Sequence, residues 1–243
     1  MVVPAPADVA ALAAARDRVL DRIADACARA GRDPAGVTLV AVSKTVPAER
    51  LAAAVGAGLT ILGENRVQEA ESKVGPVGRA EWHLVGPLQS NKTKRAVAIF
   101  DMVESVDSVE LAGRLDRLAA QLRPGRMLPV LLQVNVDRDQ AKSGFEPSDL
   151  EAHLTAMAAL DHIEIRGLMT VGRLVDRAED ARATFADLRR LSERLRSGTA
   201  GDGRPILGPE LSMGMSDDYS VAIEEGATIV RVGRALFGDR PHP

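Results

Sequence analysis

Short apolar runs alternate with helical segments along most of the chain, and this alternation restricts the fold more than any other feature. The apolar runs lie near residues 37–43, 60–63, 82–85, 102–106, 129–136, 163–169, 206–211 and 228–232. The segments between them predict helices near residues 47–57, 65–74, 88–98, 108–122, 147–159, 176–197 and 217–225. Parallel strands need a crossover connection, which is usually a helix, so this order predicts an α/β protein with a parallel sheet.

Eight strands with intervening helices predict a (β/α)8 TIM barrel, and 243 residues are enough to form one as a single domain over residues 1–243. A doubly wound open sheet is the alternative. Its first strand would be followed by a Gly-rich phosphate-binding turn, which residues 43–47 do not provide. An additional helix is expected before the barrel, because apolar residues follow mostly helical spacing up to Gly31: Leu12, Val19, Leu20, Ile23 and Cys27.

Several residues have the character of helix ends. Pro47 and Pro147 suit the first turn of a helix. Ser108 and Ser216 suit N-caps, and Gly226 suits a C-cap. These positions give approximate boundaries to four of the expected helices.

The composition argues against several classes of protein. Aromatic residues are only 2% of the chain and the formal net charge is −3, so neither a base-stacking surface nor a general attraction for nucleic acid is expected. The single cysteine, Cys27, has no internal disulfide partner, which fits a reducing compartment. No apolar stretch approaches the roughly 18 residues of a membrane span. We therefore expect a cytoplasmic protein that binds neither nucleic acid nor a membrane.

Lys44 stands at the carboxyl end of the first apolar run and is the strongest candidate for chemistry. The β-branched segment 37–45 delivers this primary amine into a loop at the expected mouth of the barrel. Partial desolvation makes loss of the ammonium proton easier, and the neutral amine can attack an aldehyde to form a Schiff base. The alternative is a lysine whose aliphatic stem packs at a strand end while its ammonium reaches solvent.

The loops after the last two strands are the usual place for a phosphate site in a TIM barrel. Gly214 and Gly233 allow backbone N–H groups to approach phosphate oxygens, and the Ser212 hydroxyl is a further donor. Alternatively, the two glycines only form tight turns. Asp217 and Asp218 disfavour a phosphate at the following helix start, where they are expected to complement the helix dipole.

Three further polar residues are candidates for the site, although His83 faces either the mouth or the core. Asn65 either donates to a ligand or caps the following helix, and the cap is the safer interpretation. His83 lies in a strand, where a structural histidine is more common than a general base. Lys142, in a polar turn after the fifth strand, is a second possible aldehyde acceptor. No histidine and acid cluster has metal-ligand spacing, and no serine has a nucleophile-elbow setting.

Seven stretches spread over the chain resemble the pyridoxal phosphate homeostasis protein family, a group of fold-type III barrels similar to the N-terminal domain of alanine racemase. They are AVSKT (41–45), GENRVQE (63–69), WHLVGPLQSNK (82–92), KSGF (142–145), RGLMT (166–170), LSMGMSDD (211–218) and VRVGRALFG (230–238). They keep the order of the family from the first strand to the last, which makes the set far more specific than any one motif.

The resemblance implies a role for each candidate residue. Lys44 would form the internal aldimine with pyridoxal 5′-phosphate, Asn65 would lie near the cofactor, and Arg231 would address the pyridine nitrogen. Ser212 and the backbone at Gly233 and Arg234 would bind the phosphate. Because a guanidinium is permanently charged and only donates, the ring nitrogen that faces it stays unprotonated, and the ring is a weak electron sink. The family often has Ser or Thr at Arg234, so here the side chain either adds charge or points to solvent.

The resemblance also implies a function in pyridoxal phosphate homeostasis, as a cytoplasmic carrier or buffer that is not an efficient enzyme. PLP-dependent apo-enzymes are the expected protein partners, and we expect a monomer. The alternative is an amino-acid racemase or Schiff-base aldolase on the same barrel, and a weaker one is a cofactor-sensing regulatory protein. Alanine racemases add a β-domain and a tyrosine opposite the lysine, whereas this chain ends at Pro243 and its only tyrosine, Tyr219, follows the seventh strand.

Overall fold

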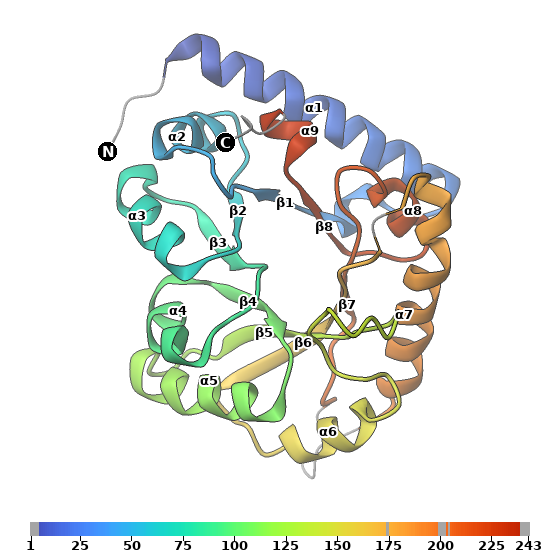
Figure 1. The fold of residues 1–243 in the computed structure, drawn as a ribbon. Coiled ribbons are helices and arrows are strands. Elements are labelled where there is room, and N and C mark those ends of the chain that lie inside the picture. Colours follow the sequence, from blue (N-terminus) through green and yellow to red (C-terminus); the bar gives the residue numbers. More distant parts are fainter. Residues whose placement is uncertain (1–4, 174, 199–202, 204, 239–243) are drawn as a thin grey trace.

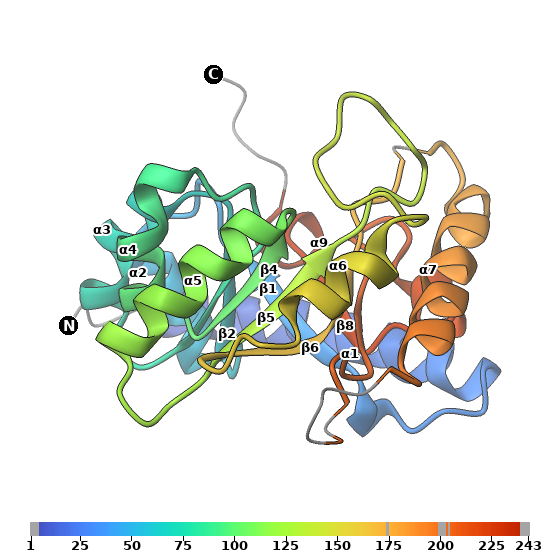
Figure 2. The ribbon, with the colours of Figure 1, turned by 90° about the horizontal axis from the view of Figure 1, so that it is seen from below.

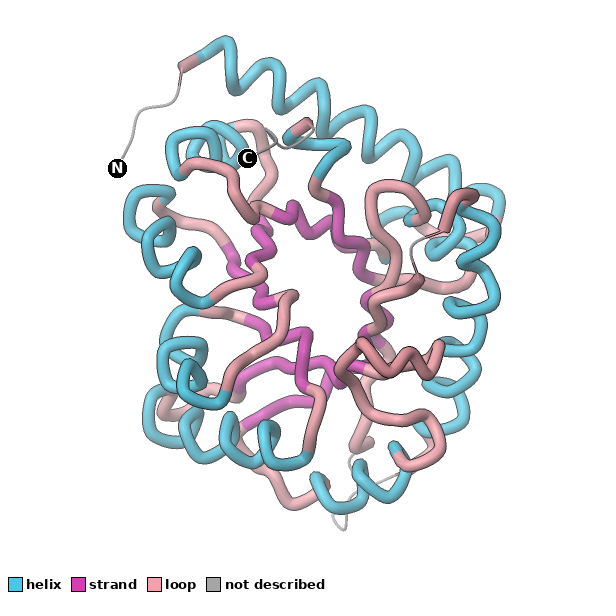
Figure 3. Tube along the Cα trace, viewed as in Figure 1, coloured by secondary structure: helices cyan, strands magenta, loops and turns pink. Residues whose placement is uncertain are grey.

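The protein folds into a closed parallel barrel surrounded by helices. The computed structural model describes residues 5–173, 175–198, 203 and 205–238. In this part of the chain eight strands pair in sequence order, and the last closes onto the first. Figures 1 and 3 show the ring of strands inside a layer of helices. The strands are β1 (Thr38–Val42), β2 (Ile61–Glu64), β3 (Glu81–Leu84), β4 (Met102–Val106), β5 (Leu128–Gln133), β6 (Ile163–Met169), β7 (Glu210–Ser212) and β8 (Ile229–Val232).

The helices follow the strands and cover the outside of the barrel. They are α1 (Pro6–Arg29), α2 (Ala48–Gly56), α3 (Val67–Val77), α4 (Thr93–Ile99), α5 (Val109–Leu122), α6 (Leu150–Met157), α7 (Arg182–Leu195), α8 (Tyr219–Glu224) and α9 (Arg234–Phe237), with short 3-10 turns at Pro34–Gly36, Ser90–Lys92 and Ala178–Ala181. The predicted additional helix is α1, which packs across α2, α8 and α9 (Figure 1). Both the barrel and its extra helix are therefore confirmed.

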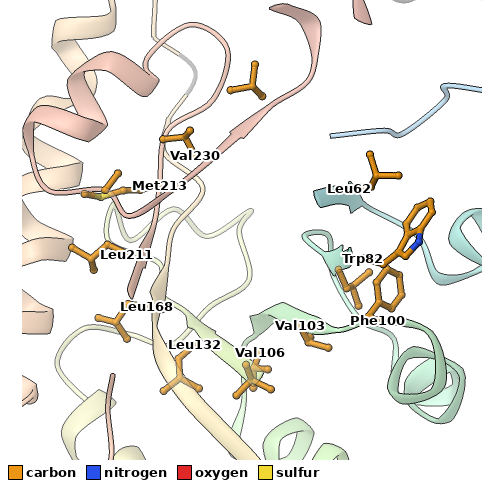
Figure 4. Packing of buried hydrophobic residues seen from close by; sticks show 14 of the residues in the cluster. Leu62, Trp82, Phe100, Val103, Val106, Leu132, Leu168, Leu211, Met213 and Val230 are labelled. Atoms are coloured by element: carbon orange, nitrogen blue, oxygen red, sulfur yellow. The ribbon is translucent and has the colours of Figure 1, made fainter. Parts of the chain in front are cut away.

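The main core lies between the outer faces of the strands and the helices. Leucine, valine and aromatic side chains from successive strands, including Leu62, Trp82, Val103 and Leu168, form this layer (Figure 4). A second, smaller apolar cluster lies inside the barrel and contains Val40, Val85, Met102, Leu131, Met169 and Ile229. Because side chains alternate between the two faces of a strand, the same strands supply both clusters and the polar groups of the interior.

Most predicted boundaries are correct to within a few residues, but three predicted helix-end residues lie elsewhere, and Pro47 is one of them, because it is the N-cap of α2 and not part of its first turn. Ser108 is an N-cap, since its side chain accepts from Leu111 N–H at 3.2 Å. Ser216 is not, because the N-cap of α8 is Asp218. Pro147 precedes α6 by three residues, in a turn closed by the Asp149 N–H and Glu146 O.

The seventh strand begins later than predicted. It covers Glu210–Ser212, whereas the apolar run at 206–211 predicts an earlier start. Pro209 has no N–H to donate to a neighbouring strand, so the regular ladder starts only after it. Gly208 N–H instead makes a single bond to Ile165 O at 2.8 Å.

Candidate functional site

Lys44 follows the carboxyl end of β1, at the end of the barrel where active sites gather in this fold. Ser43 N–H donates to Gly63 O at 2.8 Å, which continues the pairing of β1 with β2 past the end of the strand. The Ser43 hydroxyl points toward α3 and donates to Glu64 Oε1 at 2.7 Å. Lys44 and Thr45 follow in a turn that the Val46 N–H closes by donating to Ser43 O at 3.0 Å.

A buried ion cluster fastens the Lys44 loop to helix α3. Lys73 Nζ donates to Ser43 O at 2.8 Å, to Glu64 Oε1 at 2.6 Å and to Glu69 Oε1 at 2.7 Å. The Glu64 side chain is 0% exposed and that of Lys73 only 7%. Burial raises the pKa of Glu64, and the hydrogen bonds from Lys73 and Ser43 oppose that shift. The cluster therefore pairs one buried cation with carboxylates that have little access to water.

The residue after Lys44 is held in an unfavourable backbone conformation. Thr45 has a φ of 67°, in the left-handed region that β-branched residues rarely adopt. Its N–H donates to Glu69 Oε1 at 2.5 Å. Burial tends to raise the pKa of Glu69, but the bonds from Lys73 and Thr45 hold that pKa below its usual range. The ionised carboxylate thus holds the turn that presents Lys44.

A hollow of about 290 Å³ opens at the barrel mouth, and Lys44 is not among the residues that line it. Its lining includes Asn65, Val85, Gln133, Asn135, Lys142 and Val171, which come from the ends of β2, β3, β5 and β6. The N-cap of α3 is Arg66, with no side-chain capping bond. The safer interpretation of Asn65 as a helix cap is therefore wrong, and this residue faces the hollow.

Lys142 also lines the hollow, but its amine is engaged. It donates to Gly172 O at 3.0 Å and to Val171 O at 3.2 Å, and Asp139 lies 3.8 Å away. These contacts connect the loop after β5, which extends beyond the strand ends in Figure 2, to the end of β6. Carbonyl and carboxylate oxygens are suitable acceptors for an ammonium group, so Lys142 connects the loop after β5 to the segment after β6.

The glycine loops after β7 and β8 meet one another at the mouth. Gly233 N–H donates to Ser216 Oγ at 3.3 Å, which brings together one donor from each loop. Gly214 has a φ of 90°, and a Cβ on it would lie 2.5 Å from Ala222 Cβ. Gly214 is thus required for the turn onto α8, as the alternative interpretation stated, and its part in phosphate binding stays a prediction.

Two side chains near these loops have partners within the protein. The exposed Arg234 pairs with Asp217, so its charge is directed to the loop after β7. Tyr219 is buried in the helical layer, where the Arg22 guanidinium of α1 lies 4.9 Å from its ring centroid. Tyr219 therefore belongs to the outer helical layer, where it contacts α1.

A row of buried polar side chains crosses the barrel interior below the mouth. His83 Nδ1 lies 2.7 Å from Glu104 Oε1, and Ser212 Oγ donates to Glu104 Oε2 at 2.5 Å. Arg231 donates to Ser212 Oγ at 2.6 Å and to Thr170 O at 2.8 Å. His83 is thus the structural histidine that the sequence favoured, within a network that joins β3, β4, β7 and β8.

The protonation of His83 is expected to make stability depend on pH. Burial lowers the pKa of His83, but hydrogen bonds to Glu104 and Glu81 more than offset it and raise the value to about 9. A raised pKa stabilises the fold below the unfolded value of about 6.5, and this contribution is lost as the pH rises through about 9. The unfolding free energy of the wild type should therefore fall by up to about 3 kcal/mol between pH 6 and 9.5, relative to His83→Gln. Urea denaturation of both proteins measures this difference, and parallel pH profiles would contradict it.

Comparison with known proteins decides the family. The sequence family described as alanine racemase, N-terminal domain, matches residues 16–241. The pyridoxal phosphate homeostasis protein of Pseudomonas aeruginosa is 43% identical over 229 residues, which cover 93% of this chain and 94% of that protein. This chain belongs to the pyridoxal phosphate homeostasis protein family. The resemblance found in the sequence motifs is therefore confirmed.

Solved structures place this homeostasis-family chain on the same fold. PipY of Synechococcus elongatus PCC7942, solved with PLP bound, is 42% identical with a TM-score of 0.77, covering 90% of this chain and 100% of PipY. An alanine racemase from Clostridium difficile has a TM-score of 0.67 at 16% identity, which shows a shared fold alone. The relationship to the alanine racemase barrel is thus confirmed at the level of fold.

Sequence reasoning missed several residues that shape the site of this family member. Glu64, Glu69 and Lys73 hold the Lys44 loop, and Glu104 connects His83 to Ser212. A carboxylate within an apolar strand, as at Glu64 and Glu104, is a usable signal because it needs a buried partner. Which partner it finds depends on the closed barrel.

Two classes of feature are not found in the described part of the chain. None of its helices is both long enough and apolar enough to span a membrane. Nor do three or more histidine, cysteine or acidic residues gather there in a way that suits a metal ion.

Proposed function

We propose that this chain binds pyridoxal 5′-phosphate at the mouth of its barrel, attached through Lys44, and serves in the cytoplasm as a carrier or buffer of the cofactor. The observation that carries this proposal is the Lys44 loop, which a buried lysine and two carboxylates hold in one conformation. The proposal extends to residues 1–243 acting as one domain and as a monomer.

The donors at the mouth have the chemistry that pyridoxal phosphate requires. Lys44 provides an amine for the aldehyde, and Asn65 provides an amide beside the hollow. Gly233 N–H and the Ser216 hydroxyl, with the Arg234 N–H next along the chain, are donors for a phosphate dianion. When bound, the cofactor supplies an electrophilic carbon and an electron-withdrawing ring. Arg231, below the mouth, is the group that we assign to the pyridine nitrogen.

The position of Tyr219 supports a carrier in preference to a racemase. A racemase of this fold needs a second acid or base opposite the lysine, whereas Tyr219 lies in the outer helical layer. The pyridoxal phosphate homeostasis proteins that resemble this chain favour the same function.

The proposal predicts reversible loading and release without turnover. Titration with pyridoxal phosphate should saturate at one equivalent per chain, and the loaded protein should reactivate an added PLP-dependent apo-enzyme. Incubation with L-alanine and D-alanine should leave their enantiomeric ratio unchanged, as chiral chromatography would measure. Sustained racemisation, or cleavage of a β-hydroxy amino acid, would instead establish the racemase or aldolase alternative.

A further inference from the structure

Ser212 is already fully committed to other protein groups. A hydroxyl has one proton, and that of Ser212 is donated to Glu104 Oε2 at 2.5 Å. The same oxygen accepts from Arg231 at 2.6 Å. The residue is 0% exposed, so its hydroxyl presents no surface to the mouth.

If the Ser212 hydroxyl donated its hydrogen bond to a phosphate, Glu104 would lose one of its donors. Glu104 is 0% exposed and its two oxygens face His83 and Ser212. A buried carboxylate that loses a hydrogen bond pays a desolvation cost that water cannot offset. Ser216 is the better phosphate donor, because it lies at the mouth beside the Gly233 N–H.

The contacts of Arg231 show what Ser212 does instead. One terminal nitrogen of its guanidinium donates to the Ser212 hydroxyl, and the other donates to Thr170 O at 2.8 Å. Two contacts on a planar group fix its plane as well as its position. Glu104 supplies the negative charge behind Ser212, and Asp218 also acts on Arg231 electrostatically.

We infer that Ser212 and Glu104 are positioning residues that hold the Arg231 guanidinium below the barrel mouth, and that Ser212 is not a ligand of the phosphate. This inference rests on the proposed binding of pyridoxal phosphate. It reassigns Ser212 from the phosphate to the ring end of the cofactor and adds Glu104 to the site.

Binding of pyridoxal phosphate and of pyridoxal, which lacks the phosphate, tests the inference. Ser212→Ala should weaken both ligands by about the same factor, roughly 3- to 10-fold, and should shift the visible absorption band of the bound cofactor. Ser216→Ala, the matched control, should weaken pyridoxal phosphate alone. A selective loss of pyridoxal phosphate binding in Ser212→Ala would overturn the inference, as would unchanged affinities and an unchanged band.

Glu104→Gln provides a second, nearly isosteric variant should Ser212→Ala fail to fold. It should likewise weaken both ligands and shift the band, and it overturns the inference if it does neither. Failure of the proposed function is distinguishable, because the wild-type protein would then bind neither ligand. Circular dichroism of each variant establishes that the barrel is intact.

Discussion

Lys44→Ala is expected to abolish covalent retention of pyridoxal phosphate and the visible absorption band of the bound cofactor. Lys44 lies in the loop that the ion cluster of Lys73, Glu64 and Glu69 holds, and alanine removes the nucleophile without changing the strand before it. The remaining contacts would hold the cofactor at least about 100-fold more weakly, a difference of roughly 3 kcal/mol. Borohydride reduction followed by peptide mapping should find the adduct on the peptide that contains Lys44.

Two matched lysine variants make this experiment decisive. Lys142→Ala should keep the band and the adduct, because the Lys142 amine is bound to Val171 O and Gly172 O. Lys94→Ala, on the exposed side of α4, controls for general loss of a surface amine. Mapping of the reduced adduct to Lys142, or a normal band in Lys44→Ala, would refute the central assignment.

Lys73→Met is expected to cause the largest loss of stability among the substitutions considered. Methionine has a similar length but leaves the 0% exposed Glu64 carboxylate without its cation. Removing one partner of a buried ion pair typically costs about 3 to 5 kcal/mol, because the other charge stays buried. For a domain of this size, that corresponds to a fall in melting temperature of roughly 6 to 20 °C. Calorimetry and urea denaturation would measure it.

A double variant separates the uncompensated charge from lost packing. Lys73→Met combined with Glu64→Gln should recover at least about half of the lost stability, because glutamine is neutral and still accepts from Ser43. Lys94→Met should change the unfolding free energy by less than about 0.5 kcal/mol. If the double variant is no more stable than Lys73→Met, the buried charge is not the cause.

The positions of two candidate residues along the chain follow from the strands that carry them. Lys44 comes just after β1 and Arg231 lies within β8, because the spacing of apolar residues that predicts a strand is a local property, whereas the part of either residue in cofactor binding stays a prediction. Asn65 follows β2 in the same way, but Arg66 takes the N-cap position of α3 in its place.

Other expectations failed where a neighbour competes for the same atom. The Ser216 hydroxyl suited an N-cap, yet it accepts from Gly233 N–H, and Asp218 occupies the cap. Asp218 accepts from Met215 N–H at 2.6 Å within the same turn. Local propensity ranks such candidates, but it contains no information about a donor that arrives from a different loop.

The sequence by itself determined the barrel, the extra helix and the strand end that carries Lys44, since each follows from the spacing of apolar residues along one segment. Only the tertiary structure decided how that lysine is held and what Ser212 bonds to. Lys73 reaches Glu64 through the packing of α3 on β2, and Ser212 meets Glu104 from a strand 108 residues away. Closure of the barrel creates these contacts, because it brings buried charges from separate strands within hydrogen-bond distance where water cannot satisfy them.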